Sequence, residues 1–277
     1  MAAHEQFFTA PDGLQLFHRS WLPEGQSAAV VAVIHGFLEH SGRYADLAAD
    51  LNQQGYAVHA LDLRGHGRSQ GEPIFLRSFD EHLDDVEAFL GHLRQRHPGQ
   101  PLFLFGFSLG GTIGTLLAGA GRAAVRGLAL AGPGLAIDRH LFPLLRWMVP
   151  FLSWMFPRLR LVRASGKRVS RDPQVVAQFE ADSLVFHGRI PLRTGAEILR
   201  AIRQAQDAME HVTLPLLILH GTGDRITDPE GSRRLHARAA SADKTLRLYE
   251  GLYHDVLHEP EHRQVKADLI EWLRART

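Results

Sequence analysis

Ser108 lies in the pattern Gly106-Phe107-Ser108-Leu109-Gly110, with one glycine two positions before it and another two positions after it. A strand-like run, residues 102–105, precedes the pattern, and a helix-like stretch, residues 112–120, follows it. A serine raised on a sharp turn between a strand and a helix needs small residues at both positions, because a side chain would collide with neighbouring backbone. The pattern therefore indicates a nucleophilic serine, although the same glycines would also suit close helix–strand packing without chemistry.

A serine hydroxyl is a weak nucleophile near neutral pH, so it needs a base, and that base needs an acid to orient it. Asp224 lies in a turn-rich loop directly after one strand-like run, and His254 lies shortly after the last such run. The chain order serine, acid, histidine, each on a loop after a strand, is a known arrangement of a catalytic triad. We therefore predict Ser108 as nucleophile, Asp224 as acid and His254 as base, with Asp138 as a weaker alternative acid.

Two neighbouring residues fit other roles. Asp228 stands directly before a proline, which predicts a helix N-cap with proline at the first helical position. His258 follows His254 by four residues, the spacing of the two histidines in a zinc-binding helix. Asp255 replaces the glutamate of that motif and no third ligand is evident, so we do not expect zinc. We prefer His254 as the base because it comes about five residues after the last strand-like run, whereas His258 lies nearer the final helix.

An oxyanion that forms during acyl transfer needs hydrogen-bond donors. One donor is expected to be the backbone N–H of Leu109, directly after the nucleophile. The other should come from the loop after the strand-like run 28–34, where the N–H of Phe37 is the natural candidate. Ser41, in the same loop, is expected to cap a short helix, which is compatible with donation by Phe37.

The composition is that of a globular domain without covalent cross-links. The chain has 277 residues, of which 45% are hydrophobic, and no cysteine, so thiolate, disulfide and Cys-ligated metal chemistry are excluded. Because 31 basic residues nearly balance 30 acidic ones, broad binding to nucleic acid is not expected. Residues 1–8 lack the basic and apolar regions of a signal peptide, so we expect a cytoplasmic protein.

The candidate residues lie between alternating strand-like and helix-like segments. Short apolar or β-branched runs each precede a longer amphipathic stretch, at residues 28–34, 57–61, 102–107, 127–131, 216–220 and 245–249. This alternation predicts an α/β fold with a mostly parallel sheet and helices on both faces. Residues 6–9 and 14–21, on either side of a turn, predict an antiparallel hairpin at the edge of the sheet.

The alternation is interrupted between residues 133 and 213. We interpret this segment as a helical cap inserted into a core made of residues 1–132 and 214–277, over the strand ends where ligands of open α/β sheets bind. Residues 141–156 are rich in large apolar side chains, and six basic residues follow between Arg158 and Arg171. Our hypothesis is that the cap covers an acyl-chain pocket and contacts lipid aggregates or an anionic membrane. The alternative is a cap that packs on its own domain with a solvated basic face.

Several motifs occur in a fixed order along nearly the whole chain. They are His35-Gly36 with Glu39-His40-Ser41-Gly42-Arg43-Tyr44, Asp62-Leu63-Arg64-Gly65-His66-Gly67-Arg68-Ser69, the turn at Ser108, Asp182-Ser183-Leu184-Val185-Phe186-His187-Gly188, His220-Gly221-Thr222-Gly223-Asp224 and Tyr253-His254. Together they resemble the monoacylglycerol lipase and lysophospholipase branch of the serine α/β-hydrolases. The resemblance implies the α/β-hydrolase fold and assigns the same triad residues and the same oxyanion amides, those of Phe37 and Leu109.

Glu39, Phe107 and His258 are the residues that we expect to contact substrate. Phe107 stands where this family usually has a histidine before the serine, and Leu109 stands where methionine is frequent. Some monoacylglycerol lipases have a second histidine three residues after the base, whereas His258 comes four residues after His254. These departures leave the predicted triad intact and concern the polar end of the substrate pocket.

The sequence therefore predicts a serine hydrolase that cleaves carboxylic esters through an acyl-enzyme, without a metal or organic cofactor. Monoacylglycerols, lysophospholipids and medium-chain esters are the expected substrates. One alternative is a peptidase of the proline iminopeptidase type, which would need acidic residues in the cap, such as Glu180 and Asp182, to bind a free amino group. Another is a ligand-binding protein on the same fold without activity, although this chain retains all three triad residues.

Overall fold

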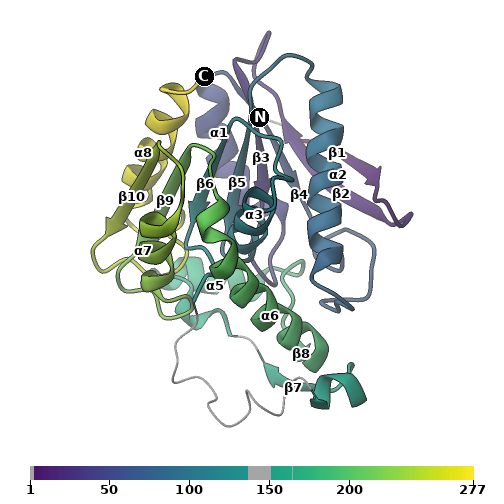
Figure 1. Ribbon diagram of the computed structural model, residues 1–277. Coiled ribbons are helices and arrows are strands. Elements are labelled where there is room, and N and C mark those ends of the chain that lie inside the picture. The colour runs from purple at the N-terminus through teal and green to yellow at the C-terminus, as the bar shows by residue number, and fades with distance from the viewer. Residues whose placement is uncertain (1–2, 137–150, 164) are drawn as a thin grey trace.

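A mixed sheet of eight strands forms the centre of the molecule (Figure 1). The computed structural model describes residues 3–136, 151–163 and 165–277. The strands lie in the order β1-β2-β4-β3-β5-β6-β9-β10. Their bounds are β1 His4–Thr9, β2 Gln15–Trp21, β3 Ala29–Ile34, β4 Tyr56–Leu61, β5 Leu102–Phe107, β6 Gly127–Ala131, β9 Leu216–Gly221 and β10 Lys244–Tyr249. The β1–β2 and β2–β4 pairs are antiparallel and the other pairs are parallel, which confirms the predicted hairpin and parallel sheet.

The parallel strands are apolar on both sides because helices cover both faces of the sheet. Every residue of β3 and β5 is buried. Successive side chains of a strand point to opposite faces, and the residues of β3 follow this rule. Its even-numbered residues, Val30, Ala32 and Ile34, belong to one hydrophobic core, and its odd-numbered residues, Ala29, Val31 and Val33, belong to the other.

Each face of the sheet has its own set of helices (Figure 1). Helices α1 (Ala45–Gln53) and α8 (His262–Arg274) pack on one face. Helices α2 (Asp80–Arg96), α3 (Leu109–Gly119) and α7 (Pro229–Arg238) pack on the other. Short 3₁₀ helices occur at Ser41–Tyr44 (η1), Gly166–Arg168 (η2) and Met209–His211 (η3).

Two of these helix starts test the predicted caps. Asp228 is the N-cap of α7, and its side chain accepts a hydrogen bond from the Glu230 N–H at 2.9 Å, which confirms the prediction. The cap predicted at Ser41 is wrong by one residue. His40 has the extended backbone of an N-cap, and its Nδ1 accepts from the Gly42 N–H at 3.1 Å, so Ser41 is the first residue of η1.

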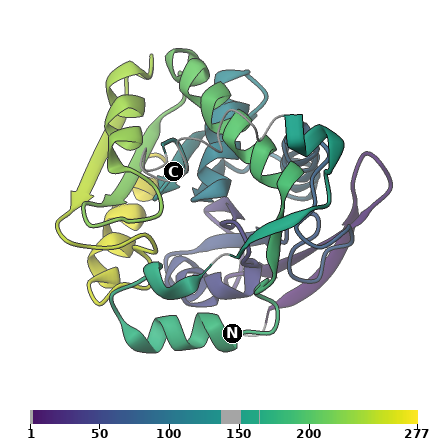
Figure 2. The same ribbon diagram turned by 90° about the horizontal axis from the view of Figure 1, so that it is seen from below.

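The segment between β6 and β9 includes elements beyond the carboxyl ends of the parallel strands, at the bottom of Figure 1, and its last helix runs from there along α3. It contains a helical stretch at residues 151–155, the antiparallel ribbon of β7 (Arg160–Arg163) and β8 (Arg189–Pro191), and helices α5 (Pro173–Ala181) and α6 (Leu192–Ala208). Figure 2 shows these elements around the strand ends in a view from below. The ribbon was not expected in a helical insertion, because its strands are short and largely exposed and lack the buried pattern of the central sheet.

Helix α6 connects the insertion to the core. Its residues Ala201 and Ala205 belong to the same hydrophobic core as α3, and these small side chains allow the two helices to approach closely. The end of the predicted cap segment 133–213 therefore packs on the core. Asp138 and the apolar residues 141–150 lie outside the described residues. Within the described ranges, no helix is long and apolar enough to cross a membrane.

Candidate active site

Ser108 lies on the sharp turn between β5 and α3. Its φ of 49° and ψ of −107° are a strained conformation for a residue with a side chain, of the kind that recurs at functional sites. A Cβ atom at Gly106 would lie 2.4 Å from the Gly110 carbonyl oxygen, and one at Gly110 would lie 2.2 Å from the Ile34 carbonyl oxygen. Only glycine fits at either position, which is the physical reason for the pattern seen in the sequence.

Ser108, His254 and Asp224 form one continuous hydrogen-bonded chain. His254 Nδ1 lies 2.7 Å from Asp224 Oδ2, and His254 Nε2 lies 2.9 Å from Ser108 Oγ. Because an ionised carboxylate can only accept, Nδ1 carries the proton and donates a hydrogen bond to Asp224. Nε2 then accepts from the Ser108 hydroxyl, so this imidazole is oriented to take the serine proton.

Asp224 is held by several groups besides His254. Its Oδ1 accepts from the backbone N–H groups of Ile226 and Thr227, at 2.7 and 3.0 Å. Its Oδ2 accepts from the Thr227 hydroxyl at 2.8 Å and lies 3.1 Å from His220 Nε2. Burial alone would raise the pKa of Asp224, but the imidazoles of His254 and His220 hold its pKa well below the usual value. No local pattern in the sequence indicates the contacts of His220 and Thr227 with Asp224, although His220 belongs to one of the motifs.

His254 is buried beneath a ring predicted to contact substrate. Burial lowers the pKa of His254, but the charge of Asp224 outweighs it and raises the pKa above its usual value. The Phe107 ring packs on the His254 ring with 5.0 Å between centroids, and Phe107 is only 5% exposed. In this structure Phe107 shields the imidazole from solvent.

The loop of residues 35–44 lies beside the serine turn. A Cβ at Gly36 would lie 2.9 Å from the Phe107 ring, so the loop backbone is in direct contact with the residue before Ser108. Within the described part of the chain, neither the Phe37 N–H nor the Leu109 N–H donates a hydrogen bond. Both amides are therefore available to a substrate atom.

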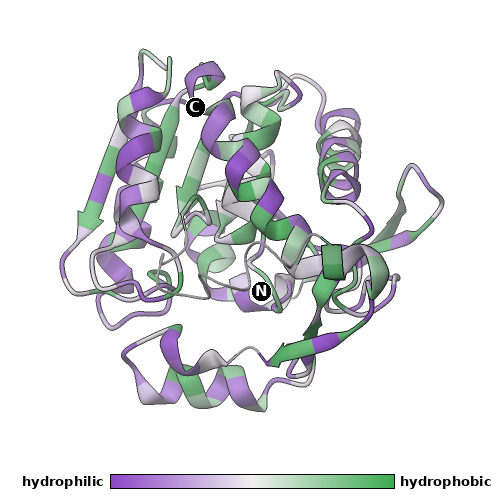
Figure 3. Ribbon diagram, turned by 60° about the horizontal axis from the view of Figure 1, so that its bottom comes forward, coloured by the Kyte–Doolittle hydropathy of each residue, from purple (hydrophilic) through white to green (hydrophobic). Residues whose placement is uncertain are grey.

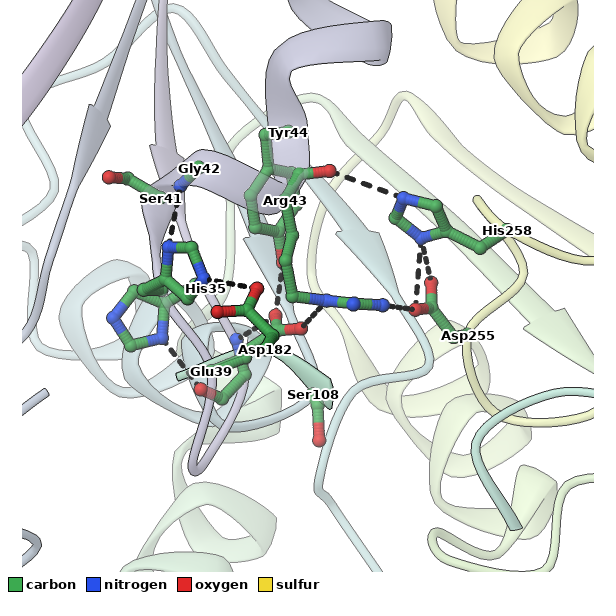
Figure 4. A network of polar contacts seen from close by, with 12 residues as sticks. His35, Glu39, Ser41, Gly42, Arg43, Tyr44, Ser108, Asp182, Asp255 and His258 are labelled. Carbon is green, nitrogen blue, oxygen red and sulfur yellow. Dashed lines mark hydrogen bonds and ion pairs between the residues drawn. The ribbon is translucent and has the colours of Figure 1, made fainter. Parts of the chain in front are cut away.

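A buried ionic chain joins this loop to the loop that carries His254 (Figure 4). Arg43 donates from Nε to Glu39 Oε2 at 2.9 Å and from a terminal nitrogen to Asp255 Oδ2 at 3.0 Å. Asp255 in turn lies 2.9 Å from His258 Nδ1. The side chains of Glu39, Arg43 and Asp255 are 4%, 8% and 5% exposed. Their ion pairs with one another therefore compensate for the hydration that burial removes.

Glu39 and His258, both predicted to contact substrate, have their polar atoms engaged in this chain. Glu39 Oε1 accepts from the Gly36 N–H at 2.8 Å and from the Tyr44 hydroxyl at 2.7 Å. His258 faces Asp255 through Nδ1, and its Nε2 lies 3.2 Å from the Arg43 carbonyl oxygen. Burial lowers the pKa of His258, but Asp255 outweighs it and raises the pKa. His254 and His258 thus face different partners.

The insertion contacts both loops of the site. His40 Nε2, in the first loop, lies 2.9 Å from Asp182 Oδ2, which follows α5. The Phe186 N–H donates to the Leu38 carbonyl at 2.9 Å. On the other side, the Asp255 N–H donates to the Val169 carbonyl at 2.8 Å. Residues 165–191 therefore bridge the loop with Phe37 and the loop with His254.

The chain is similar to known proteins along most of its length. The family described as serine aminopeptidase, S33, matches residues 25–261. Monoacylglycerol lipase from Mycolicibacterium smegmatis is 34% identical over 269 residues, which span 97% of this chain and 96% of that protein. The chain belongs to the monoacylglycerol lipase family. Human monoglyceride lipase is 36% identical over 275 residues, 96% of this chain and 89% of that protein.

Solved structures support the same assignment. The monoacylglycerol lipase of Paleococcus ferrophilus, 32% identical, superposes with a TM-score of 0.85 over 95% of this chain and 99% of its own. A soluble variant of monoglyceride lipase from Saccharomyces cerevisiae, 24% identical, has a TM-score of 0.89 over 100% of this chain and 96% of its own, and supports the fold. The α/β-hydrolase fold and the carboxylic ester hydrolase class predicted from the sequence are confirmed for this family member.

Proposed function

We propose that the chain hydrolyses monoacylglycerols and related simple esters through an acyl-enzyme on Ser108. The observation that carries the proposal is the unbroken chain of hydrogen bonds from Ser108 Oγ through His254 to Asp224. The relatives named monoacylglycerol lipase support the choice of glycerol ester as substrate. Lysophospholipids share the same ester linkage and are the second class to test.

The hydrogen bonds of the site assign a role to each residue of the triad. His254 Nε2 takes the hydroxyl proton as Ser108 Oγ attacks the ester carbonyl carbon, and Asp224 stabilises the resulting imidazolium. The carbonyl oxygen becomes an oxyanion between the N–H groups of Phe37 and Leu109. His254 then returns the proton to the leaving alcohol. Water then attacks the acyl carbon as His254 takes its proton, and the bond from Ser108 Oγ to the acyl carbon breaks as His254 returns the proton to Oγ, which releases the fatty acid. These steps need no metal or organic cofactor.

The acidic residues of the insertion argue against a peptidase that binds a free amino group, despite the aminopeptidase in the family description. Asp182 Oδ2 contacts His40, and its Oδ1 accepts from the Leu184 N–H at 2.9 Å. Glu180 Oε1 accepts from the Gly166 N–H at 2.8 Å. Since both carboxylates serve contacts within the protein, an ester is the better substrate.

Residues 133–213 act as the cap of the site in this proposal, and their exposed part contacts lipid. Large apolar side chains are exposed in the described segment 151–162: Phe151, Trp154, Met155, Phe156, Leu159, Leu161 and Val162. Arg158, Arg160 and Arg163 lie among them. Figure 3 shows hydrophobic residues on the insertion as well as in the central sheet. Exposed apolar side chains beside arginines suit the interface of lipid aggregates or an anionic membrane.

The activity is tested with monoacylglycerols and 4-nitrophenyl esters of several chain lengths, together with lysophospholipids and aminoacyl anilides. We expect ester turnover by the wild type, no cleavage of anilides, and loss of at least about 10³-fold in kcat in Ser108→Ala. Cleavage of anilides alone would favour the peptidase. A wild type inert on every substrate would favour a ligand-binding protein without activity.

The membrane contact is tested by co-sedimentation with vesicles of phosphatidylcholine, with and without phosphatidylglycerol. We expect binding to the anionic vesicles at low salt and weaker binding at high salt, because arginines contribute to the attraction. Absence of binding to anionic vesicles at low salt would contradict the proposal and favour the cap with a solvated basic face.

A further inference from the structure

The peptide group between Gly36 and Phe37 is hydrogen-bonded to a buried histidine. His35 Nδ1 lies 2.6 Å from the Gly36 carbonyl oxygen, and His35 is 0% exposed. A trans peptide group is planar, so its C=O and its N–H point in opposite directions. A hydrogen bond that fixes the direction of the Gly36 carbonyl therefore also fixes the direction of the Phe37 N–H.

A second hydrogen bond sets which nitrogen of His35 carries the proton. The backbone N–H of Leu63 donates to His35 Nε2 at 2.9 Å, so Nε2 accepts. In a neutral imidazole the other nitrogen then carries the hydrogen, and Nδ1 donates to the Gly36 carbonyl. Burial lowers the pKa of His35 to about 4, which keeps the ring neutral at pH 7. Leu63 comes two residues after the end of β4, which pairs with β3 up to Ile34, so the segment after a neighbouring strand fixes the tautomer.

The N–H of Gly36 is held from the other side by Glu39. It donates to Glu39 Oε1 at 2.8 Å, and the Tyr44 hydroxyl donates to the same oxygen. Arg43 holds the second carboxylate oxygen at 2.9 Å. Because Glu39 is buried and both of its oxygens are paired, its position is fixed, and it fixes the start of the loop in turn. Figure 4 shows Glu39 among these partners near Ser108.

We propose that His35 and Glu39 are positioning residues of the oxyanion site, which together hold Gly36 so that the Phe37 N–H faces an ester carbonyl attacked by Ser108. This inference rests on the proposed function, since it takes Phe37 as an oxyanion donor. Neither side chain contacts the reacting atoms. Their effect falls on the transition state, because the oxyanion forms only as Ser108 attacks.

Two substitutions of His35 separate orientation from packing. Asparagine places an amide N–H where Nδ1 stands, whereas glutamine reaches only the position of Nε2. With 4-nitrophenyl butyrate, we expect kcat to fall about 100-fold in His35→Gln and less than about tenfold in His35→Asn, with KM changed less than about threefold. An alkyl trifluoromethyl ketone forms a tetrahedral adduct with an active serine, and its affinity should fall in the same order.

Glu39→Gln tests the second contact, with Glu197→Gln as the matched control. Glu197 is 6% exposed, accepts from the Phe79 N–H at 3.1 Å and pairs with Arg200 at 2.7 Å, so it is a similar buried carboxylate in α6. We expect kcat to fall about tenfold in Glu39→Gln and to stay within about twofold in the control. Thermal midpoints of all variants separate lost stability from lost orientation.

Equal kcat in His35→Asn and His35→Gln, or unchanged ketone affinity in both, would overturn the role of His35. Equal losses in Glu39→Gln and Glu197→Gln would overturn the role of Glu39. Ser108→Ala is assayed in parallel with the wild type. If Ser108→Ala keeps wild-type turnover, the proposed function itself fails. If it abolishes turnover while the His35 and Glu39 variants keep wild-type kcat, only the positioning inference fails.

Discussion

The candidate catalytic residues and the exposed segment of the insertion present opposite kinds of surface. Ser108 and His254 are 9% and 4% exposed, and they are hydrogen-bonded to each other. In the insertion, Phe151 and Trp154 are 62% and 74% exposed. Buried polar groups must find partners within the protein, whereas exposed apolar groups gain from a partner outside it. The candidate catalytic residues are therefore satisfied by the chain itself, whereas the exposed apolar side chains of the insertion are the ones that the proposed lipid contact would cover.

The ion pairs of the two regions differ in the same way. Arg43, beside the triad, has a side chain that is 8% exposed and contacts Glu39 and Asp255. Arg158, in the insertion, is 63% exposed and pairs with Glu72 at 3.1 Å. A buried charge depends on its partners because it has lost water, whereas an exposed charge keeps its hydration. Removing a charged side chain should therefore lower the free energy of unfolding strongly beside the triad and only slightly in the insertion.

The largest effect is expected at Asp224. In Asp224→Asn the side-chain amide can donate to His254 Nδ1, which favours the tautomer with the proton on Nε2, where it cannot accept from Ser108. We expect kcat for 4-nitrophenyl butyrate to fall about 10⁴-fold in steady-state assays. Asp228→Asn is the control, because asparagine caps a helix as well as aspartate does and kcat should stay unchanged. A kcat of Asp224→Asn within about tenfold of wild type would place the acid elsewhere.

Arg43→Met compares the two regions directly. It leaves the carboxylates of Glu39 and Asp255 buried without their guanidinium, so we expect the free energy of unfolding to fall by about 3–5 kcal/mol. Arg158→Met removes an exposed ion pair and should change it by less than about 1 kcal/mol. Denaturant titrations at pH 7 measure both. Similar losses of unfolding free energy in the two variants would mean that burial does not determine how strongly these ion pairs contribute to stability.

The pH dependence of stability tests a buried group outside both regions, His18 on strand β2. Burial lowers the pKa of His18 to about 4 from an ordinary 6.5, and neither ring nitrogen has a partner among the described residues. The unfolded chain therefore binds the proton more readily, and stability falls as pH drops below 6.5 towards 4. Protonation of this residue on unfolding should lower the free energy of unfolding at pH 4.5 by about 2–3 kcal/mol relative to pH 7.

His18→Leu should remove that part of the acid destabilisation in denaturant titrations at pH 7 and 4.5. His4→Leu, on the neighbouring strand β1, is the control, because His4 is exposed and its ring stays in water when the chain folds. The pH dependence in this control should match that of the wild type. If His18→Leu is as acid-sensitive as wild type, another buried group is responsible.

The difference between local and long-range contacts also explains what could be predicted from the sequence. The strands follow from short apolar or β-branched runs, and the turn at Ser108 follows from glycine spacing, both within short segments. The ion pair of Arg43 with Asp255 joins residues 212 positions apart, and no local pattern indicates it. The ribbon β7–β8 was missed for a related reason, since it is short and mostly exposed. The motif that contains Glu39 is visible in the sequence and predicts contact with substrate. The buried hydrogen bonds of the Glu39 carboxylate are not visible there and appear only in the structure.

The smallest effect on stability, and the one that tests the role of the insertion, is expected for Trp154→Ser. Since Trp154 is exposed, the free energy of unfolding should change by less than about 0.5 kcal/mol, and kcat on a soluble ester should stay within about twofold. Binding to anionic vesicles should fall several-fold, because an indole ring favours the membrane interface.

Phe7→Ser, which changes an apolar side chain on β1 that is 52% exposed, is the control and should leave vesicle binding intact. Equal losses in both variants would mean that any exposed ring contributes and that the insertion has no special affinity for lipid. A loss confined to Trp154→Ser would instead assign lipid contact to the insertion, while the soluble-ester assay would show that catalysis proceeds without it.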